Sequence, residues 1–309
     1  MKNVIIGFCC AVILLLGISA VQQSSTNDAL KKEMENARPF NENYKIYSIE
    51  LPEQLDFAGE SVPLANPDIK ERTDREFLVN TYWQSNTILL LKRAAQYFPI
   101  IEPILEEQGV PDDFKYLAVI ESGLQNVTSP AGAKGFWQIM PATGNELGLE
   151  INSNVDERYH VAKATRAACT YLKQSYAKFG SWTLAAAAYN GGNGGINGRL
   201  DKQDVASYYD MHLGEETGRY VFRILAVKSI MQDPALYGFE IKESHLYKEV
   251  PVKLITVNEP IADLAVFAKD QGINYKILKI HNPWLREARL NNATKTPYEI
   301  AIPKPGIYK

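Results

Sequence analysis

One glutamate in this sequence, Glu121, has the placement of a general acid. It lies four residues after Leu117 and three after Ala118, on the apolar stripe of a helix predicted over 112–121. Gly123 follows, so the carboxyl group also lies at the helix C-terminus, where the macrodipole disfavours a negative charge. Both effects raise the pKa of the carboxyl group, desolvation first and the dipole second. A carboxylic acid that stays protonated near neutral pH can cleave a glycosidic bond by general-acid catalysis.

Periodicity alone leaves one alternative for Glu121. If the helix frays at its end, the carboxyl group points into solvent and keeps an ordinary pKa. The residues that follow the helix favour the first interpretation, because they belong to a larger pattern.

Four short motifs follow one another along the chain. They are Glu121-Ser122, the run from Gly135 to Thr143 with its Trp137-Gln138 and Met140-Pro141 pairs, Ala188-Tyr189-Asn190, and Glu216-Thr217-Gly218-Arg219-Tyr220-Val221. In this order they resemble the catalytic core of the lytic transglycosylases of the soluble-transglycosylase (SLT) and goose-type-lysozyme group. The resemblance is closest to the membrane-bound transglycosylase D family and covers residues 95–235.

The resemblance implies a mainly α protein with a lysozyme-like helical domain that acts on peptidoglycan glycan strands. It makes Glu121 the catalytic acid and then the base. It also implies that Ser122 contacts the substrate or supports the helix end. No cofactor or metal is expected, and the oligomeric state stays open.

The same resemblance assigns residues around the saccharide. Tyr189 and Asn190 are expected to line the site near the catalytic carboxyl group, while Gln138 and Met140 belong to the floor of the cleft. Tyr220 is expected to orient either the catalytic carboxyl group or the sugar.

The chemistry implied by the family needs only one carboxyl group. Retaining and inverting glycosidases use two at set separations, whereas a lytic transglycosylase uses the 2-acetamido group and the 6-hydroxyl of its own substrate and leaves a 1,6-anhydro end. Asp112 and Asp113 are left open as second acids. The alternatives are a muramidase-type hydrolase and a non-catalytic scaffold that binds the cell wall.

Helices must position these groups. Apolar periodicity predicts helices over 76–98, 100–108, 112–121, 156–179 and 215–232, and an alanine-rich helix that begins after Ser181. The GGNGG run at 191–195 is predicted to be a loop at the edge of the cleft. It is not a phosphate cradle, since no Gly-Lys-Ser/Thr follows it.

Composition excludes some classes of function. The 309 residues carry a formal net charge of −3, with the basic residues scattered, so a nucleic-acid partner is not expected. His212, His245 and His281 stand apart and form no zinc pattern. Cys169 lies among small apolar residues and is expected to be a core residue rather than a nucleophile.

The N-terminal segment has the character of an export signal. Lys2 precedes an apolar run that ends near Ala20, and polar residues follow. We expect residues 1–20 to direct the chain to the periplasm or cell envelope. A retained membrane anchor and lipidation at Cys9 or Cys10 are the alternatives, so membrane association through this segment stays open.

The rest of the chain divides into four parts. We expect a polar tether over 21–43, an N-terminal extension over 44–95 that packs on the catalytic domain, the catalytic domain over 96–240, and a C-terminal module over 248–303. The module is similar to a LysM domain in its strand–helix–helix–strand order and its Asn282-Pro283 pair. Val257-Asn258-Glu259-Pro260 replaces the usual Gly-Asp-Thr turn, which leaves glycan binding by the module open.

Overall fold

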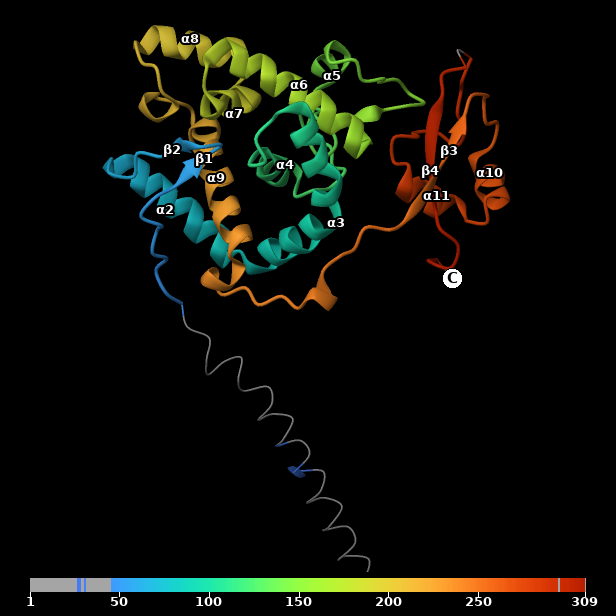
Figure 1. Ribbon diagram of the computed structural model, residues 1–309, viewed down its shortest axis with the longest axis horizontal. Helices are drawn as coiled ribbons and strands as arrows, with labels where there is room; N and C mark the ends of the chain where they lie inside the picture. Colours follow the sequence, from blue (N-terminus) through green and yellow to red (C-terminus); the bar gives the residue numbers. More distant parts are fainter. Residues whose placement is uncertain (1–26, 29–30, 32–45, 294, 309) are drawn as a thin grey trace, which may run out of the picture. The chain divides into compact units, whose positions relative to one another are not determined.

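The computed structural model describes residues 27–28, 31, 46–293 and 295–308 (Figure 1). The chain divides after Ser48, and every element below belongs to the second unit, Ile49–Lys309. The predicted export signal over 1–20 and nearly all of the tether over 21–43 lie outside the described residues. In the described part of the chain, no helix combines the length and the apolar character needed to cross a membrane.

The part of the chain from β1 to α9 is built almost entirely of helices, as predicted. In chain order its elements are β1 (Asp56–Phe57), β2 (Glu60–Ser61), α2 (Pro67–Tyr82), α3 (Gln84–Gln108), α4 (Phe114–Ser122), α5 (Pro141–Glu146), α6 (Val161–Phe179), α7 (Trp182–Gly191), α8 (Asn193–Gln203) and α9 (Glu215–Gln232). Strands β1 and β2 form a short antiparallel hairpin. Short 3-10 helices lie at Glu157–Tyr159, Tyr208–Asp210, Pro234–Tyr237 and Glu243–His245.

Helix α4 lies at the centre of this domain and carries the candidate acid near its end. Phe114, Leu117 and Ala118 are completely buried, and the helix packs against α3 and α9 (Figure 1). Four consecutive buried alanines of α7, residues 185–188, let that helix pack closely against α6, α8 and α9. The small side chains bring the half-buried Tyr189-Asn190 pair at the end of α7 close to the neighbouring helices.

The segment before α3 is held against helices α7 and α9. Helix α2 packs along α9, and Phe77 lies in a hydrophobic cluster with Ala226 and Ile230. Glu60 on β2 accepts hydrogen bonds from the Ser181 hydroxyl at 2.7 Å and from the backbone N–H of Thr183 at 2.9 Å. The hairpin therefore caps the start of α7, where unpaired N–H groups need acceptors.

Several predicted helix boundaries are wrong. The helix predicted over 156–179 begins only at Val161, after a separate 3-10 turn at Glu157–Tyr159. The helices predicted over 76–98 and 100–108 are instead divided at Trp83, and α3 continues through Pro99 and Pro103. Each proline removes one helical hydrogen bond, but Ile101 and Leu105 are fully buried between and after them. Packing of this apolar face outweighs the local penalty of the prolines.

The GGNGG run is only partly a loop. Gly192 alone among its residues has a positive φ, of 74°, and the chain resumes a helix, α8, at Asn193. The prediction of a continuous loop over 191–195 is therefore wrong for every residue except Gly192, because Gly191 ends α7 and residues 193–195 begin α8. The run is a tight helix-to-helix junction that directs α8 away from the end of α7.

The C-terminal module has the predicted strand–helix–helix–strand order. Its elements are β3 (Val252–Val257), α10 (Leu264–Asp270), α11 (Tyr275–His281) and β4 (Tyr298–Pro303). The strands are antiparallel, with Val252 opposite Pro303 and Val257 opposite Tyr298. Tyr298, Ile300 and Ile302 alternate along β4 and are buried against the two helices.

Candidate active site

Glu121 is the penultimate residue of α4 and is half-buried. The helix ends at Gly123, which has a left-handed φ of 60° and donates its N–H to the Val119 carbonyl at 2.8 Å. Burial raises the pKa of Glu121 to about 7; a hydrogen bond from Tyr220 and the charge of Arg223 oppose this rise. Near neutral pH the carboxyl group is therefore present both as the acid and as the carboxylate. A group that must first donate and then accept a proton needs both forms.

Two tyrosines lie near this carboxyl group, Tyr220, which is buried, and Tyr189, which is half-buried. The Tyr220 hydroxyl donates a hydrogen bond to Glu121 Oε1. The Tyr189 hydroxyl donates to the Trp137 carbonyl at 2.7 Å. Burial, and after it the charge of Glu121, raises the pKa of both phenols well above the ordinary value. Both tyrosines thus stay neutral hydrogen-bond donors throughout the range in which Glu121 titrates.

Ser122, predicted either to contact substrate or to support the helix end, is buried and bonded to the backbone. Its buried hydroxyl donates to the Phe136 carbonyl at 2.8 Å and lies 3.2 Å from the Ala118 carbonyl. These contacts support the helix end and tie it to the loop formed by residues 127–139, called here the 127–139 loop. A direct role in substrate binding stays a prediction.

Gln138 and Met140 lie at the end of the 127–139 loop and just beyond it. Gln138 has a φ of 45°, and its side-chain amide donates to the carbonyls of Gly135 at 2.8 Å and Val127 at 3.2 Å. Met140 is 41% exposed, high for a large apolar side chain. The exposed Met140 thioether lies beside a loop that the Gln138 amide holds in shape. It offers an apolar surface on which a sugar ring could rest.

Asn190 connects the end of α7 to the start of α9. Its side-chain oxygen accepts a hydrogen bond from the Thr217 hydroxyl at 2.7 Å, and its amide donates to Glu216 Oε1 at 3.3 Å. Glu216 is near enough to Glu121 for its charge to raise the pKa of that carboxyl group. The structure therefore gathers the Glu121, Tyr189-Asn190 and Glu216–Tyr220 motifs in one place.

Two arginines that the sequence reasoning missed cap the end of α4. Arg223 donates to the Ile120 carbonyl at 3.0 Å, and Arg93 donates to the Gly123 carbonyl at 3.1 Å. They satisfy carbonyls that the last turn of a helix leaves without partners, on either side of Glu121. Arg223 lies three residues after Tyr220 on α9, so helical spacing could have placed it on the same face.

The two aspartates left open as second acids have other partners. Asp112 pairs with Lys115 at 2.6 Å, and Asp113 pairs with Lys228 at 2.7 Å and accepts the Ala58 N–H at 2.7 Å. Asp113 lies at the opposite end of α4 from Glu121, about 12 Å away at the rise of an α-helix. That separation exceeds the span of a glycosidase carboxyl pair, so neither aspartate completes such a pair.

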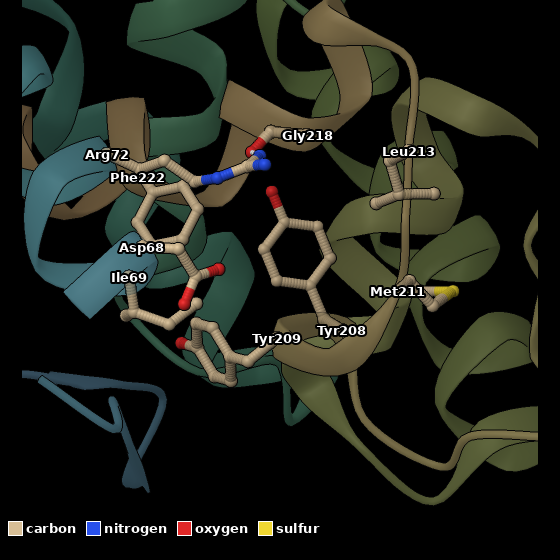
Figure 2. A pocket seen from close by; sticks show the side chains of 9 residues that line it. All are labelled: Asp68, Ile69, Arg72, Tyr208, Tyr209, Met211, Leu213, Gly218 and Phe222. Atoms are coloured by element: carbon tan, nitrogen blue, oxygen red, sulfur yellow. Dashed lines mark hydrogen bonds between the residues drawn. The ribbon is translucent and has the colours of Figure 1, made fainter. Parts of the chain in front are cut away.

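Two hollows lie away from the carboxyl group. One of about 20 Å³, between α2 and α9, has room for roughly one water molecule. Figure 2 shows Arg72 and Tyr208 converging there on the start of α9, where they donate to the carbonyls of Gly218 at 3.4 Å and Thr217 at 2.9 Å. The other hollow, about 770 Å³ in volume, lies beside Asp112 at the amino end of α4. Neither is lined by Glu121.

Two segments of the chain match known domain families. Residues 98–211 match the family described as "Transglycosylase SLT domain", and residues 253–306 match the "Soluble lytic transglycosylase C-terminal LysM-like domain". The first match contains Glu121, Gln138 and Asn190.

Similar whole proteins are also known. The chain is 27% identical over 260 residues to a membrane-bound lytic murein transglycosylase D of Escherichia coli K12. The aligned region covers 80% of this chain and 55% of that relative, so the chain spans about half of the relative's length.

Solved structures give weaker similarity. The 70 kDa soluble lytic transglycosylase of Escherichia coli is 18% identical, with a TM-score of 0.41 over 70% of this chain and 43% of that one. An inactive variant of the lytic transglycosylase Slt of Pseudomonas aeruginosa is 19% identical, with a TM-score of 0.36 over 50% of this chain and 26% of that one.

Proposed function

We propose that the chain is a peptidoglycan lytic transglycosylase, and the match of residues 98–211 to the transglycosylase SLT domain family supports this proposal. In this proposal it is a carbon–oxygen lyase that cleaves the β-1,4 bond between N-acetylmuramic acid and N-acetylglucosamine. One observation carries the proposal: a half-buried glutamate, Glu121, has a pKa of about 7 and a hydrogen bond from a buried tyrosine, Tyr220.

In the first step, the neutral Glu121 carboxyl group donates its proton to the glycosidic oxygen. The bond from that oxygen to the anomeric carbon breaks, and the N-acetylglucosamine side leaves as an alcohol. The positive charge on the anomeric carbon is taken up by the 2-acetamido group of the muramyl sugar. Proton donation of this kind contributes about 10²–10⁴-fold to a rate.

In the second step, the Glu121 carboxylate accepts the proton of the muramyl 6-hydroxyl. The oxygen of that hydroxyl forms a bond to the anomeric carbon, which closes a 1,6-anhydro ring and restores the neutral acid. No water is consumed. A group that alternates between acid and base works best when its pKa lies near the working pH, and Glu121 meets this condition.

Tyr220 serves both steps by holding the carboxyl group. Its hydroxyl fixes Oε1, which leaves Oε2 to face the glycosidic oxygen. The Tyr220 phenol favours the carboxylate while burial favours the acid, so the two effects keep the free-energy difference between the protonation states small.

The remaining predicted residues would bind the glycan. Gln138 and Met140 would form the floor, and Tyr189 and Asn190 would form the wall near the scissile bond. Ser122 would act through the helix end, since its hydroxyl already donates to the Phe136 carbonyl.

The location of the protein follows from the relatives and the N-terminal segment. We infer that the chain acts in the cell envelope, where its peptidoglycan substrate lies, and that residues 1–20 take it there. Cleavage, retention as an anchor and lipidation at Cys9 or Cys10 are the three alternatives for this segment.

The products of digestion test the proposal. Purified sacculi are incubated with the protein, and the soluble fragments are analysed by mass spectrometry. We expect muramyl ends lighter by one water than hydrated ends. Hydrated ends alone would show a muramidase-type hydrolase, and intact sacculi with bound protein would show a non-catalytic scaffold.

A further inference from the structure

The C-terminal module shares a hydrophobic core with the catalytic domain. Val155 and Tyr159 belong to the chain before α6, yet both are buried in the cluster formed by Trp284, Leu285 and the rest of the module. The Arg286 guanidinium lies 4.2 Å from the centroid of the Tyr159 ring. A module that moved freely on a linker would expose these apolar surfaces to water.

Hydrogen bonds fix the register of this contact. The segment of residues 150–159, called here the docking segment, pairs with the chain that follows α11. The Asp156 N–H donates to the Trp284 carbonyl at 2.9 Å. The buried Asn154 side chain donates to the Arg289 carbonyl at 2.7 Å and accepts the Asn291 N–H at 2.8 Å.

A third contact comes from the sheet of the module. The Tyr298 hydroxyl on β4 donates to Glu150 Oε2 at 2.8 Å. The Tyr298 ring stacks on Trp284 with the ring centroids 5.6 Å apart, and both side chains are buried. The Tyr298 side chain therefore packs on Trp284 within the module and also contacts the docking segment.

The docking segment in turn holds the 127–139 loop. Arg158, 2% exposed, pairs with Asp156 and donates to the carbonyls of Gly132 and Ile139, each at 3.2 Å. Gly135 lies so close to the Arg158 backbone that an added Cβ would be 1.9 Å from its carbonyl oxygen. Gly132, within the 127–139 loop, and Ile139, at its end, are thus both bound to the docking segment.

The 127–139 loop contacts two residues beside the candidate catalytic group. Its Phe136 carbonyl accepts the Ser122 hydroxyl at 2.8 Å, next to Glu121, and its Trp137 carbonyl accepts the Tyr189 hydroxyl at 2.7 Å. A continuous series of contacts therefore connects the C-terminal module to the residues beside Glu121.

From these contacts, and resting on the proposed function, we propose that the C-terminal module is a positioning element of the active site. Through Asn154 and Arg158, the module holds the 127–139 loop in register with Glu121. The module then affects the catalytic step rather than the binding of glycan. Asn154 is the positioning residue on which this role depends most, because its side chain makes two of the hydrogen bonds.

The test uses the full chain with Asn154→Ala, and Tyr298→Phe as a milder second variant that removes a single hydroxyl. Lys269→Ala, on the exposed side of α10, is the control for a change in the module away from the contact. Hydrogen–deuterium exchange of the free proteins measures how readily the backbone of the 127–139 loop opens. Steady-state kinetics on soluble peptidoglycan fragments give kcat and KM.

We expect Asn154→Ala to speed exchange in the 127–139 loop while exchange in α9 stays unchanged. We expect kcat to fall about tenfold with KM within about twofold, because a small misplacement of catalytic groups lowers the rate of the chemical step. Tyr298→Phe should shift both measurements in the same direction by less, and Lys269→Ala should shift neither.

Two results would overturn the proposal. One is faster exchange at residues 284–291 with unchanged exchange in the 127–139 loop and unchanged kcat. The other is a raised KM with unchanged kcat, which would make the module a glycan-binding surface. If the unaltered protein does not cleave peptidoglycan, the proposed function fails, while the exchange measurement still decides whether the module holds the loop.

Discussion

The Tyr220 hydroxyl donates a hydrogen bond to Glu121 Oε1 and so joins the first turns of α9 to the end of α4. The donor is buried and neutral, and the acceptor lies between the cap provided by Arg223 and the left-handed turn at Gly123. Burial raises the pKa of Glu121, and the Tyr220 bond is the larger of the two effects that oppose this rise.

Replacing Tyr220 by phenylalanine should raise the pKa of Glu121 further. The hydroxyl stabilises the carboxylate, so its loss favours the acid. The pH profile of kcat/KM reports the pKa values of the free enzyme. We expect its alkaline limb to move from about pH 7 in the unaltered protein to higher pH in Tyr220→Phe.

A matched control for this variant is Tyr171→Phe. The Tyr171 hydroxyl donates to the Ala188 carbonyl at 3.0 Å rather than to Glu121, so the alkaline limb should not move. A limb that stays in place in Tyr220→Phe, or moves to lower pH, would show that this bond does not tune the acid.

Glu121→Gln should lose at least about 10²-fold in kcat, the low end of what general-acid catalysis contributes. Glutamine keeps the shape and can still accept the Tyr220 hydrogen bond, but it cannot donate and retrieve a proton. Glu216→Gln is the matched change at the neighbouring carboxyl group, and we expect it to lose less than about tenfold. Normal cleavage by a folded Glu121→Gln protein would refute the assignment.

The same variant has an effect on stability that depends on pH. The folded state raises the pKa of Glu121 to about 7 from an ordinary value of 4.5. The neutral acid therefore contributes stability below about pH 4.5, and this contribution is lost as pH rises through 7. Thermal unfolding should show Glu121→Gln with a higher Tm than the unaltered protein at pH 8 and a similar Tm at pH 4.

Glu60→Ala should destabilise the domain by about 1–2 kcal/mol at pH 7, the cost of losing a helix N-cap. Burial raises the pKa of Glu60, but the hydrogen bonds from Thr183, Ser181 and Trp182 outweigh it and lower the pKa overall. The stabilisation is therefore present above the ordinary pKa and lost as pH falls through the lowered value.

Urea unfolding at pH 7 and pH 3 measures this loss. The exposed Glu53→Ala serves as the control and should change the free energy of unfolding little. A loss for Glu60→Ala that is the same at both values of pH would contradict a cap made by the carboxylate.

Gly135→Ala should destabilise by about 4 kcal/mol or more. The φ of 78° disfavours any side chain, and the added Cβ would lie 1.9 Å from the Arg158 carbonyl oxygen. Gly132→Ala is the matched control, since its φ of 88° is also positive but no atom lies within 4 Å of its Cβ. We expect Gly132→Ala to cost about 1–2 kcal/mol, and equal losses in urea unfolding would contradict the close contact.

Local pattern predicts some features of the site well. Leu117 and Ala118 gave the register that brings Glu121 close to the domain core, and Gly123 gave the end of the helix. Helix α9 begins and ends where the sequence predicts, at Glu215 and Gln232. These features depend on neighbours within a few turns, which periodicity describes.

Other features depend on contacts between distant segments. Arg93 reaches Gly123 from α3, and Glu60 reaches α7 from a hairpin far away in sequence. No spacing rule relates these pairs. Pro99 and Pro103 locally disfavour a helix, yet tertiary packing keeps α3 helical through both of them.

The measurement that tests the central claim most directly is digestion of peptidoglycan in water labelled with a heavy oxygen isotope. If Glu121 delivers the muramyl 6-hydroxyl to the anomeric carbon, mass spectrometry will show anhydro-muramyl ends that carry no label, and Glu121→Gln will release none of them. Muramyl ends that each carry one labelled oxygen would show that water is the nucleophile and would contradict the transglycosylase mechanism.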